Sequence, residues 1–422
     1  MFEKCLNMNV AELSLSATLE INEKSNELIR KGVKVYKLGL GQSPFPVPTP
    51  VVEELKRYAY VKDYLPVKGL EKLREVITTY YKKSQGLSFK PENILIGPGS
   101  KELIFIAQLV LYSELILPSP SWVSYAPQAK IAARKCTWID TKEDNDWLLS
   151  PEQLEDYCKN HTFNQKTMIL NYPNNPTGKT YNEEQLKELA QVCRKYGVIV
   201  ISDEIYGELD HDGNHVSIAR FYPEGTIVSS GLSKWCGAGG WRLGTFALPE
   251  SLSWLADKMA SVASETFTSV SAPIQYAAIR AFDFDDEIVD YLERSRKTLK
   301  TLSDFIHSKL TKANITTPKA DGAFYYLINF SFYRDKLVGR GIKTSRELCK
   351  RVLEDTGVAF LPGDDFGRPA DEFTARIAYV DFDGERALEA AKTEPVDVNF
   401  IRKYCSNTVV AIEKICDWVL SL

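Results

Sequence analysis

Hydrophobic and polar positions follow two different periods in the first two thirds of the chain, which predicts strands interleaved with helices. Residues 198–202 are a continuous apolar run ending in serine, typical of a buried parallel strand. The preceding stretch, 183–196, carries apolar residues at helical spacing. Asn182 is its expected cap, with Gln185 at the capping-box position, and Gly197 its expected end. A helix that leads directly into a strand is one half of a βαβ unit.

Three further short apolar runs predict strands of the same sheet: residues 93–96, 168–170 and 226–229. Polar residues follow where these strands stop. Asn175 comes after the second run, Asp203 and Tyr206 follow the strand at 198–202, and Lys234 lies beyond the third. Ligands of open α/β sheets bind outside the carboxyl ends of the strands. The sequence therefore predicts a site where these side chains meet.

The turn after residues 93–96 predicts a second component of this site. Gly97-Pro98-Gly99 leads into an almost wholly apolar, and therefore buried, helix that begins near Ser100. A buried helix that starts on such a turn binds anions through its first backbone amides. We expect a phosphate to meet the amides of Ser100 and Lys101, with the Lys101 side chain in solvent.

The run from Ser229 to Gly244 is the most informative stretch of the chain. Lys234 follows Ser233 and precedes a glycine cluster and Arg242. A lysine amine forms a Schiff base with an aldehyde, and hydroxyls with a guanidinium fork hold a phosphate. The pattern therefore suits an aldehyde cofactor that carries a phosphate. The alternative is a surface Ser-Lys pair beside a glycine-rich turn.

These motifs occur in the order found in one family. The chain resembles the class I/II aminotransferases, fold-type I pyridoxal 5'-phosphate enzymes similar to bacterial aspartate and aromatic amino acid aminotransferases. Besides the runs above, the resemblance rests on segments 13–18, 39–45, 64–70, 97–101, 120–122, 362–367 and 375–378. It covers nearly the whole chain.

The resemblance implies an α/β fold with two domains. The large domain, expected at 47–299, has a mostly parallel central sheet flanked by helices. A smaller α+β domain is expected from both chain ends, 1–46 and 300–422, joined to the large one by a long helix near 284–312. Within the small domain, the charged stretch 381–398 predicts an exposed loop.

The resemblance also implies roles in cofactor chemistry. Lys234 is expected to form the Schiff base and to move the substrate proton. Asp203 is expected to pair with the pyridine nitrogen, and Tyr206 and Asn175 with the phenolic oxygen of the cofactor. Trp122 is expected to stack on the ring. The alternative for Asp203 is a solvated acid at a strand end. The alternative for Trp122 is an aromatic residue that packs in the core.

The phosphate and the substrate carboxylate have expected partners as well. Arg242 and Ser233, together with the turn at Gly99, are expected at the phosphate. Ser230 is less certain, because Gly231 stands where many relatives have serine. Arg376 is expected to bind the substrate α-carboxylate, with Gly41 and Asn175 lining the same pocket. An arginine facing water from an edge strand is the alternative for Arg376.

Tyr64 lies in a segment far from every strand end. In similar enzymes this tyrosine reaches the phosphate of the neighbouring subunit, so the resemblance implies a homodimer with shared active sites. The alternative is a turn tyrosine that packs on its own chain.

Composition excludes several other classes. A net charge of −4 over 422 residues gives no basic surface for nucleic acid. No apolar stretch suits a signal peptide or a membrane span. The eight cysteines are scattered, as in a cytoplasmic protein with reduced thiols. The four histidines are too few and too dispersed for a metal site, and His211 and His215 are expected in a solvated turn.

The predicted function is transfer of the amino group of an L-amino acid (aspartate, aromatic or alanine-like) to a 2-oxo acid such as 2-oxoglutarate. A carbon–sulfur lyase or a cyclopropane-carboxylate-synthase-like enzyme on the same scaffold is the alternative, since it shares the cofactor residues. A regulator would need an added DNA-binding domain, for which we expect no room before the fold begins near residue 13. The sequence does not name the amino acid.

Overall fold

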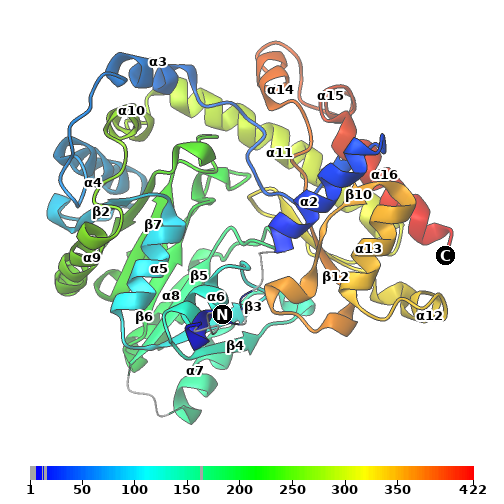
Figure 1. Ribbon diagram of the computed structural model, residues 1–422, viewed down its shortest axis with the longest axis horizontal. Coiled ribbons are helices and arrows are strands. Elements are labelled where there is room, and N and C mark those ends of the chain that lie inside the picture. The colour runs from blue at the N-terminus through cyan, green and yellow to red at the C-terminus, as the bar shows by residue number, and fades with distance from the viewer. Residues whose placement is uncertain (1–5, 12, 14–16, 162–164) are drawn as a thin grey trace, which may run out of the picture.

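The computed structural model describes residues 6–11, 13, 17–161 and 165–422. Figure 1 shows a large lobe around a broad sheet and a smaller lobe in which blue N-terminal helix α2 lies beside orange and red C-terminal elements. Ser14, Leu15 and Ser16 of the first resemblance motif lie outside the described residues.

The large lobe is built on a seven-stranded sheet with the order β2-β8-β7-β6-β5-β3-β4. Only β8 runs antiparallel to its neighbours, so the sheet is mostly parallel, as predicted. Its strands are β2 (Ile94–Gly97), β3 (Glu114–Ser119), β4 (Cys136–Asp140), β5 (Lys166–Asn171), β6 (Ile199–Asp203), β7 (Thr226–Gly231) and β8 (Gly244–Ala247).

Helices cover both faces of this sheet because successive strand residues point to opposite sides. Ile199 and Ile201 of β6 pack in one apolar cluster, while Val198 and Val200 pack in another. The helices of this lobe are α3 (Thr49–Tyr58), α4 (Glu71–Gln85), α5 (Ser100–Val110), α6 (Tyr125–Ile131), α7 (Pro151–Asn160), α8 (Glu183–Tyr196), α9 (Ser253–Glu265) and α10 (Ala272–Phe282).

Helix α8 has the predicted bounds because both of its ends are encoded locally. The Asn182 side chain accepts from the Gln185 amide and the Gln185 side chain binds back, while Gly197 ends the helix with a left-handed φ of 61°. The following strand begins one residue later than predicted and includes Asp203, which places that carboxylate on the sheet rather than after it.

The smaller lobe contains a three-stranded sheet, β11-β12-β9, and a parallel pair of β1 with β10. These strands are β1 (Tyr36–Lys37), β9 (Tyr325–Asn329), β10 (Val358–Ala359), β11 (Leu361–Pro362) and β12 (Thr374–Ala378). Its helices are α2 (Ala17–Arg30), α12 (Arg334–Gly339), α13 (Ser345–Thr356), α14 (Gly384–Ala390), α15 (Val398–Tyr404) and α16 (Ser406–Leu420), and a four-residue helix α1 (Met8–Ala11) contacts α6 in the large lobe.

Helix α11 (Asp286–Lys312) is the long helix expected near 284–312. It crosses the predicted boundary between residues 299 and 300. The division into 47–299 against 1–46 and 300–422 remains a prediction. Among the residues that the structure describes, no helix is both long enough and apolar enough to cross a membrane.

The prediction of an exposed loop over 381–398 was wrong. Helix α14 forms inside this stretch, capped by the Asp383 side chain on the Arg386 amide. Ala387 and Leu388 are buried. A seven-residue helix in which only Gly384, Ala387 and Leu388 are buried is too short to reveal a period among so many charges, so the sequence pattern resembled a loop.

Candidate active site

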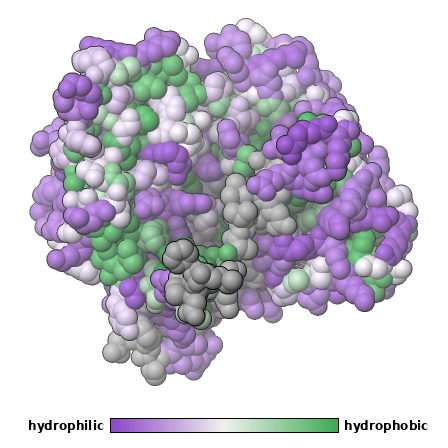
Figure 2. Space-filling view, viewed as in Figure 1, coloured by the Kyte–Doolittle hydropathy of each residue, from purple (hydrophilic) through white to green (hydrophobic). Residues whose placement is uncertain are grey.

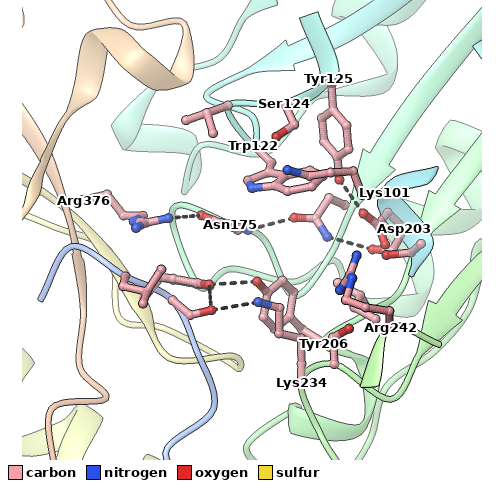
Figure 3. Close-up of a pocket in the computed structure, with 18 residues that line it drawn as sticks. Lys101, Trp122, Ser124, Tyr125, Asn175, Asp203, Tyr206, Lys234, Arg242 and Arg376 are labelled. Carbon is pink, nitrogen blue, oxygen red and sulfur yellow. Dashed lines mark hydrogen bonds between the residues drawn. The ribbon is translucent and has the colours of Figure 1, made fainter. Parts of the chain in front are cut away.

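The carboxyl ends of the central strands open into a cavity of about 400 Å³ that also meets the small lobe. Figure 3 shows side chains from both lobes converging on it. The predicted residues that line it are Gly41, Ser100, Lys101, Trp122, Asn175, Asp203, Tyr206, Ser233, Lys234, Arg242 and Arg376. Of the serines in doubt, Ser233 lines the cavity, whereas Ser230 is a buried residue of β7 outside this lining.

Lys234 follows β7 and carries its amine into the centre of the cavity. Its Nζ donates to the Gly41 carbonyl at 2.8 Å and lies 5.5 Å from the centre of the Tyr206 ring. Desolvation, helped by the charge of Arg376, lowers the pKa of Lys234 to about 8. A much larger share of this amine is therefore neutral, and nucleophilic, near pH 7 than in an ordinary lysine.

Asp203 ends β6 and is buried. Its Oδ2 accepts from the Tyr125 hydroxyl at 2.5 Å and its Oδ1 accepts from the Ser229 hydroxyl at 3.4 Å. Desolvation raises the pKa of Asp203 to about 6, although the Tyr125 hydrogen bond works against that rise. The sequence did not single out Tyr125, whose apolar neighbours made it look like another core aromatic.

Tyr206 is joined to a second residue that sequence reasoning missed. Its hydroxyl lies 2.8 Å from the hydroxyl of Tyr325 on β9. Tyr325 also donates to the Gly41 carbonyl at 3.5 Å, and a Cβ on Gly41 would lie 2.0 Å from the Tyr325 oxygen. Only glycine therefore fits at position 41 against this phenol. The aromatic run 324–326 gave no sign of which ring faces the site.

Arg376 lies on β12 and is buried, with a 2% exposed surface. Its Nη1 donates to the Asn175 side chain at 3.2 Å and its Nη2 to the Gly39 carbonyl. The guanidinium lies 4.9 Å from the Tyr325 ring and 5.0 Å from the Phe366 ring. Its Nε is buried without a hydrogen-bond partner. A buried cation with a free donor, whose pKa is lowered by desolvation, is suited to bind a carboxylate.

The end of the cavity away from Arg376 also carries positive charge. Helix α5 begins there, and the first amides of a helix have no intrahelical acceptor. Arg242 approaches this turn, with Nη2 donating to the Pro98 carbonyl at 3.1 Å. A Cβ on Gly99, which has φ of 92°, would lie 2.3 Å from the Arg242 guanidinium. The turn therefore needs glycine to let the arginine in.

Lys101 presents a further cation at this end. Its side chain is exposed, as expected, with Nζ 4.9 Å above the Trp122 ring. Desolvation and the charge of Arg242 lower its pKa. Lys101 lies beside the turn at Gly99, and it has no acidic partner among the hydrogen bonds and ion pairs of the described residues.

Of the residues predicted at the cofactor, Gly99 and Tyr64 are not in the cavity lining. Tyr64 is 89% exposed and does not line the site of its own chain.

The prediction of a solvated turn for His211 and His215 was wrong. His211 is buried, and the His215 ring, with 10% of its side chain exposed, contacts Glu204 at 2.9 Å. The glycine and asparagine of this loop suggested solvent, but the loop folds back over the end of β6. Within the described part of the chain, no cluster of acidic, histidine or cysteine side chains suits a metal ion.

Comparisons with known proteins agree on one family. The family model for aminotransferase class I and II matches residues 33–390. The chain belongs to this family. It is 35% identical to an aspartate aminotransferase of Geobacillus stearothermophilus over 86% of this chain and 92% of the relative. It is 34% identical to a probable aspartate/prephenate aminotransferase of Aquifex aeolicus over 92% and 97%.

A solved structure confirms the fold. The aspartate aminotransferase of Thermus thermophilus with maleate superposes with a TM-score of 0.84, at 28% identity, over 98% of this chain and 100% of that chain. The protein is therefore a pyridoxal-phosphate-dependent aminotransferase that acts on amino acids and 2-oxo acids. Neither comparison favours the lyase or synthase alternative.

The cavity fits this cofactor by its own chemistry. Asp203 is a buried carboxylate that accepts hydrogen bonds from two hydroxyls and from the backbone at Ile205, and no ion pair of the described residues neutralises it. A protonated ring nitrogen would supply the missing charge. Arg242 and the start of α5 form an anion site at the far end, and Lys234 provides the amine between them. Asp203 therefore matches the protonated ring nitrogen of the cofactor, the anion site matches its phosphate, and Lys234 matches its aldehyde.

Proposed function

We propose that this aminotransferase prefers dicarboxylic substrates, with aspartate as donor and 2-oxoglutarate as acceptor. The observation that carries the proposal is the number of cations. Arg242 suits the cofactor phosphate and Arg376 the α-carboxylate, which leaves Lys101 for a second carboxylate. Similarity to enzymes named aspartate aminotransferase supports the same choice.

The remaining residues have proposed roles in the chemistry. Bound pyridoxal phosphate supplies an aldehyde that bonds to amines and a ring that draws electron density from the substrate Cα. The Asp203 carboxylate keeps a proton on the ring nitrogen. Tyr206 and Asn175 would hydrogen-bond the phenolic oxygen of the cofactor, and Trp122 would stack on its ring.

The phosphate is held by the amides of Ser100 and Lys101, by the turn at Gly99 and by Ser233 with Arg242. Each of these groups lies at the cationic end of the cavity or in the turn beside it.

Proton transfer is assigned to Lys234. With cofactor and substrate bound, the neutral Nζ of Lys234 would take up the proton from the substrate Cα and hold it for return. The lowered pKa of about 8 supports this role, since only the neutral amine accepts a proton. The carbonyl of Gly41, 2.8 Å from Nζ, orients the amine.

We further propose a cytoplasmic homodimer in which Tyr64 of each subunit completes the phosphate site of the other. The Tyr64 side chain is 89% exposed, so it is available to a partner subunit. The seven cysteines in the described residues are all free thiols, which suits the reducing cytoplasm.

Replacement of Lys101 tests the substrate preference. Lys101→Ala should lower kcat/KM for aspartate by about 10- to 150-fold, the value of a hydrogen bond between charged groups. The kcat/KM for phenylalanine, which lacks the second carboxylate, should fall much less. Lys142→Ala, which removes an exposed lysine outside the cavity lining, is the matched control. An equal fall in kcat/KM for both donors would refute the assignment and would indicate that the Lys101 side chain binds the cofactor phosphate.

A further inference from the structure

Arg368 is a buried arginine, 9% exposed, that no step above uses. It follows the segment Gly363–Phe366 of the small lobe. Its Nε and Nη2 donate to the two carboxylate oxygens of Glu372 at 2.9 and 2.6 Å. Its guanidinium also lies 4.7 Å from the Trp147 ring. This fork binds Arg368 to its own segment and leaves Nη1 for other partners.

Nη1 crosses to the large lobe. It donates to the Ser119 hydroxyl at 3.2 Å and to the carbonyls of Ser119 and Thr141 at 3.4 and 3.3 Å. It also lies 3.7 Å from the carboxylate of Asp140, whose side chain is 78% exposed and remains hydrated without the arginine. Ser119 ends β3, and Thr141 follows the last residue of β4. The arginine therefore ties the small lobe to the carboxyl ends of two strands, the edge at which the active site lies.

Two further bonds join the same segments. The Ser121 amide donates to the Phe366 carbonyl at 3.0 Å, and the Ser119 hydroxyl donates to the Gly367 carbonyl at 2.7 Å. The residue after Ser121 is Trp122, which lines the active-site cavity. The chain from Phe366 to Arg368 is thus fixed against the segment that carries this tryptophan.

The other side of the same segment contacts the carboxylate site. The fully buried Phe366 ring lies 5.0 Å from the Arg376 guanidinium, and the Tyr325 ring lies 4.9 Å from the same guanidinium. Arg376 donates hydrogen bonds to the Asn175 side chain and to the Gly39 carbonyl. The two rings therefore confine its plane, and a shift of Phe366 would change the direction of its free donor.

We propose that Arg368 is a positioning residue for substrate binding: by tying the Phe366 segment to β3 and β4, it holds Phe366 against Arg376. This inference rests on the proposed role of Arg376 in binding the α-carboxylate. Arg368 itself touches neither substrate nor cofactor. Its loss should weaken carboxylate binding while leaving the cofactor residues in place.

The test separates positioning from stability. Arg368→Met strands the Glu372 carboxylate and should lower both the Tm and the affinity for maleate, a dicarboxylate probe. The double variant Arg368→Met/Glu372→Met also removes the carboxylate, and replacing a largely buried ion pair, here with side chains 7% and 30% exposed, by apolar residues is often neutral for stability. We expect the double variant to regain the Tm of wild type. Its holoenzyme should nevertheless bind maleate about tenfold more weakly than the wild-type holoenzyme. Maleate affinity that recovers together with Tm would overturn the proposal.

Arg368→Lys retains the charge without the planar fork. We expect it to bind maleate as weakly as the double variant, and wild-type affinity in this variant would overturn the proposal. Phe366→Leu combined with Arg368→Met supplies a double-mutant cycle. If Arg368 acts through Phe366, their effects on maleate affinity do not add, whereas full additivity would contradict that route.

Arg376→Gln distinguishes failure of the inference from failure of the proposed function. If Arg376→Gln leaves maleate affinity unchanged, Arg376 does not bind the carboxylate, and both the proposed role and this inference fail. If Arg376→Gln abolishes binding and the Arg368 variants do not alter it, the inference alone fails.

Discussion

Replacement of Asp203 by asparagine should stabilise the cofactor-free protein while destroying its chemistry. The Asp203 carboxylate is buried, and desolvation raises its pKa from 3.8 to about 6. Its ionised form is therefore a cost in the folded state when no cofactor is present. Asparagine has nearly the shape of the protonated acid, carries no charge and can still accept from Tyr125.

The pKa shift sets the size of this effect. A rise of about two pKa units corresponds to about 3 kcal/mol, since each unit is worth about 1.4 kcal/mol. Because the folded pKa is the higher one, the penalty is absent well below pH 3.8 and grows as pH rises toward 6. The gain from Asp203→Asn should be about 3 kcal/mol at pH 7 to 8 and about half of that at pH 5.

Urea unfolding of the cofactor-free protein between pH 5 and 8 measures the gain. Asp144→Asn is the matched control, since Asp144 is an exposed aspartate of the same lobe that lies outside the cavity lining. It should change stability by less than about 0.5 kcal/mol. Adding pyridoxal phosphate should favour wild type, because only the carboxylate pairs with the ring nitrogen. A gain absent at pH 8, or one that grows toward pH 5, would refute the burial argument.

The other predictions concern Lys234 and Tyr64. Lys234→Ala should abolish turnover yet retain noncovalent cofactor, as read by absorbance after gel filtration; normal transamination by this variant would contradict the assignment. Cofactor capture by the cofactor-free protein needs a neutral amine, so its rate should rise with pH about tenfold per unit below pH 8 and level off above it, following the pKa of about 8. A plateau that persists down to pH 6 would exclude Lys234 as the titrating group. Mixing Lys234→Ala with Tyr64→Phe subunits should raise activity upon exchange, because one site per heterodimer is then intact. Activity equal to the average of the parents, with exchange confirmed by mass, would exclude shared sites.

The parts of the fold that the sequence predicted are those encoded locally. Helix α8 has a capping box at Asn182 and a glycine at its end, so its bounds follow from neighbouring residues alone. The convergence of Asp203 and Lys234 on one cavity follows from the parallel direction of β6 and β7. Periodicity and strand direction were enough for both.

The contacts that sequence reasoning missed are made between segments far apart in the chain. Tyr125 reaches Asp203 across 78 residues, and Tyr206 reaches Tyr325 across 119. Tyr125 and Tyr325 are two of many aromatic residues in the chain, and residue type alone indicates only that they are buried. Glu204 similarly draws His215 into the interior through a loop whose composition suggested solvent. Pairing of this kind depends on tertiary placement, which no local pattern contains.

The short parallel pair of β1 with β10 has a consequence for synthesis. Tyr36 pairs with Val358, which follows it by 322 residues. At about 5–20 residues per second, the ribosome reaches β10 roughly 15–60 s after β1 has been made. Strand β1 and Gly39, whose carbonyl binds Arg376, therefore leave the ribosome long before their partners exist. The nascent chain must keep this first strand unpaired while the central sheet folds, which makes it a segment for chaperones to protect.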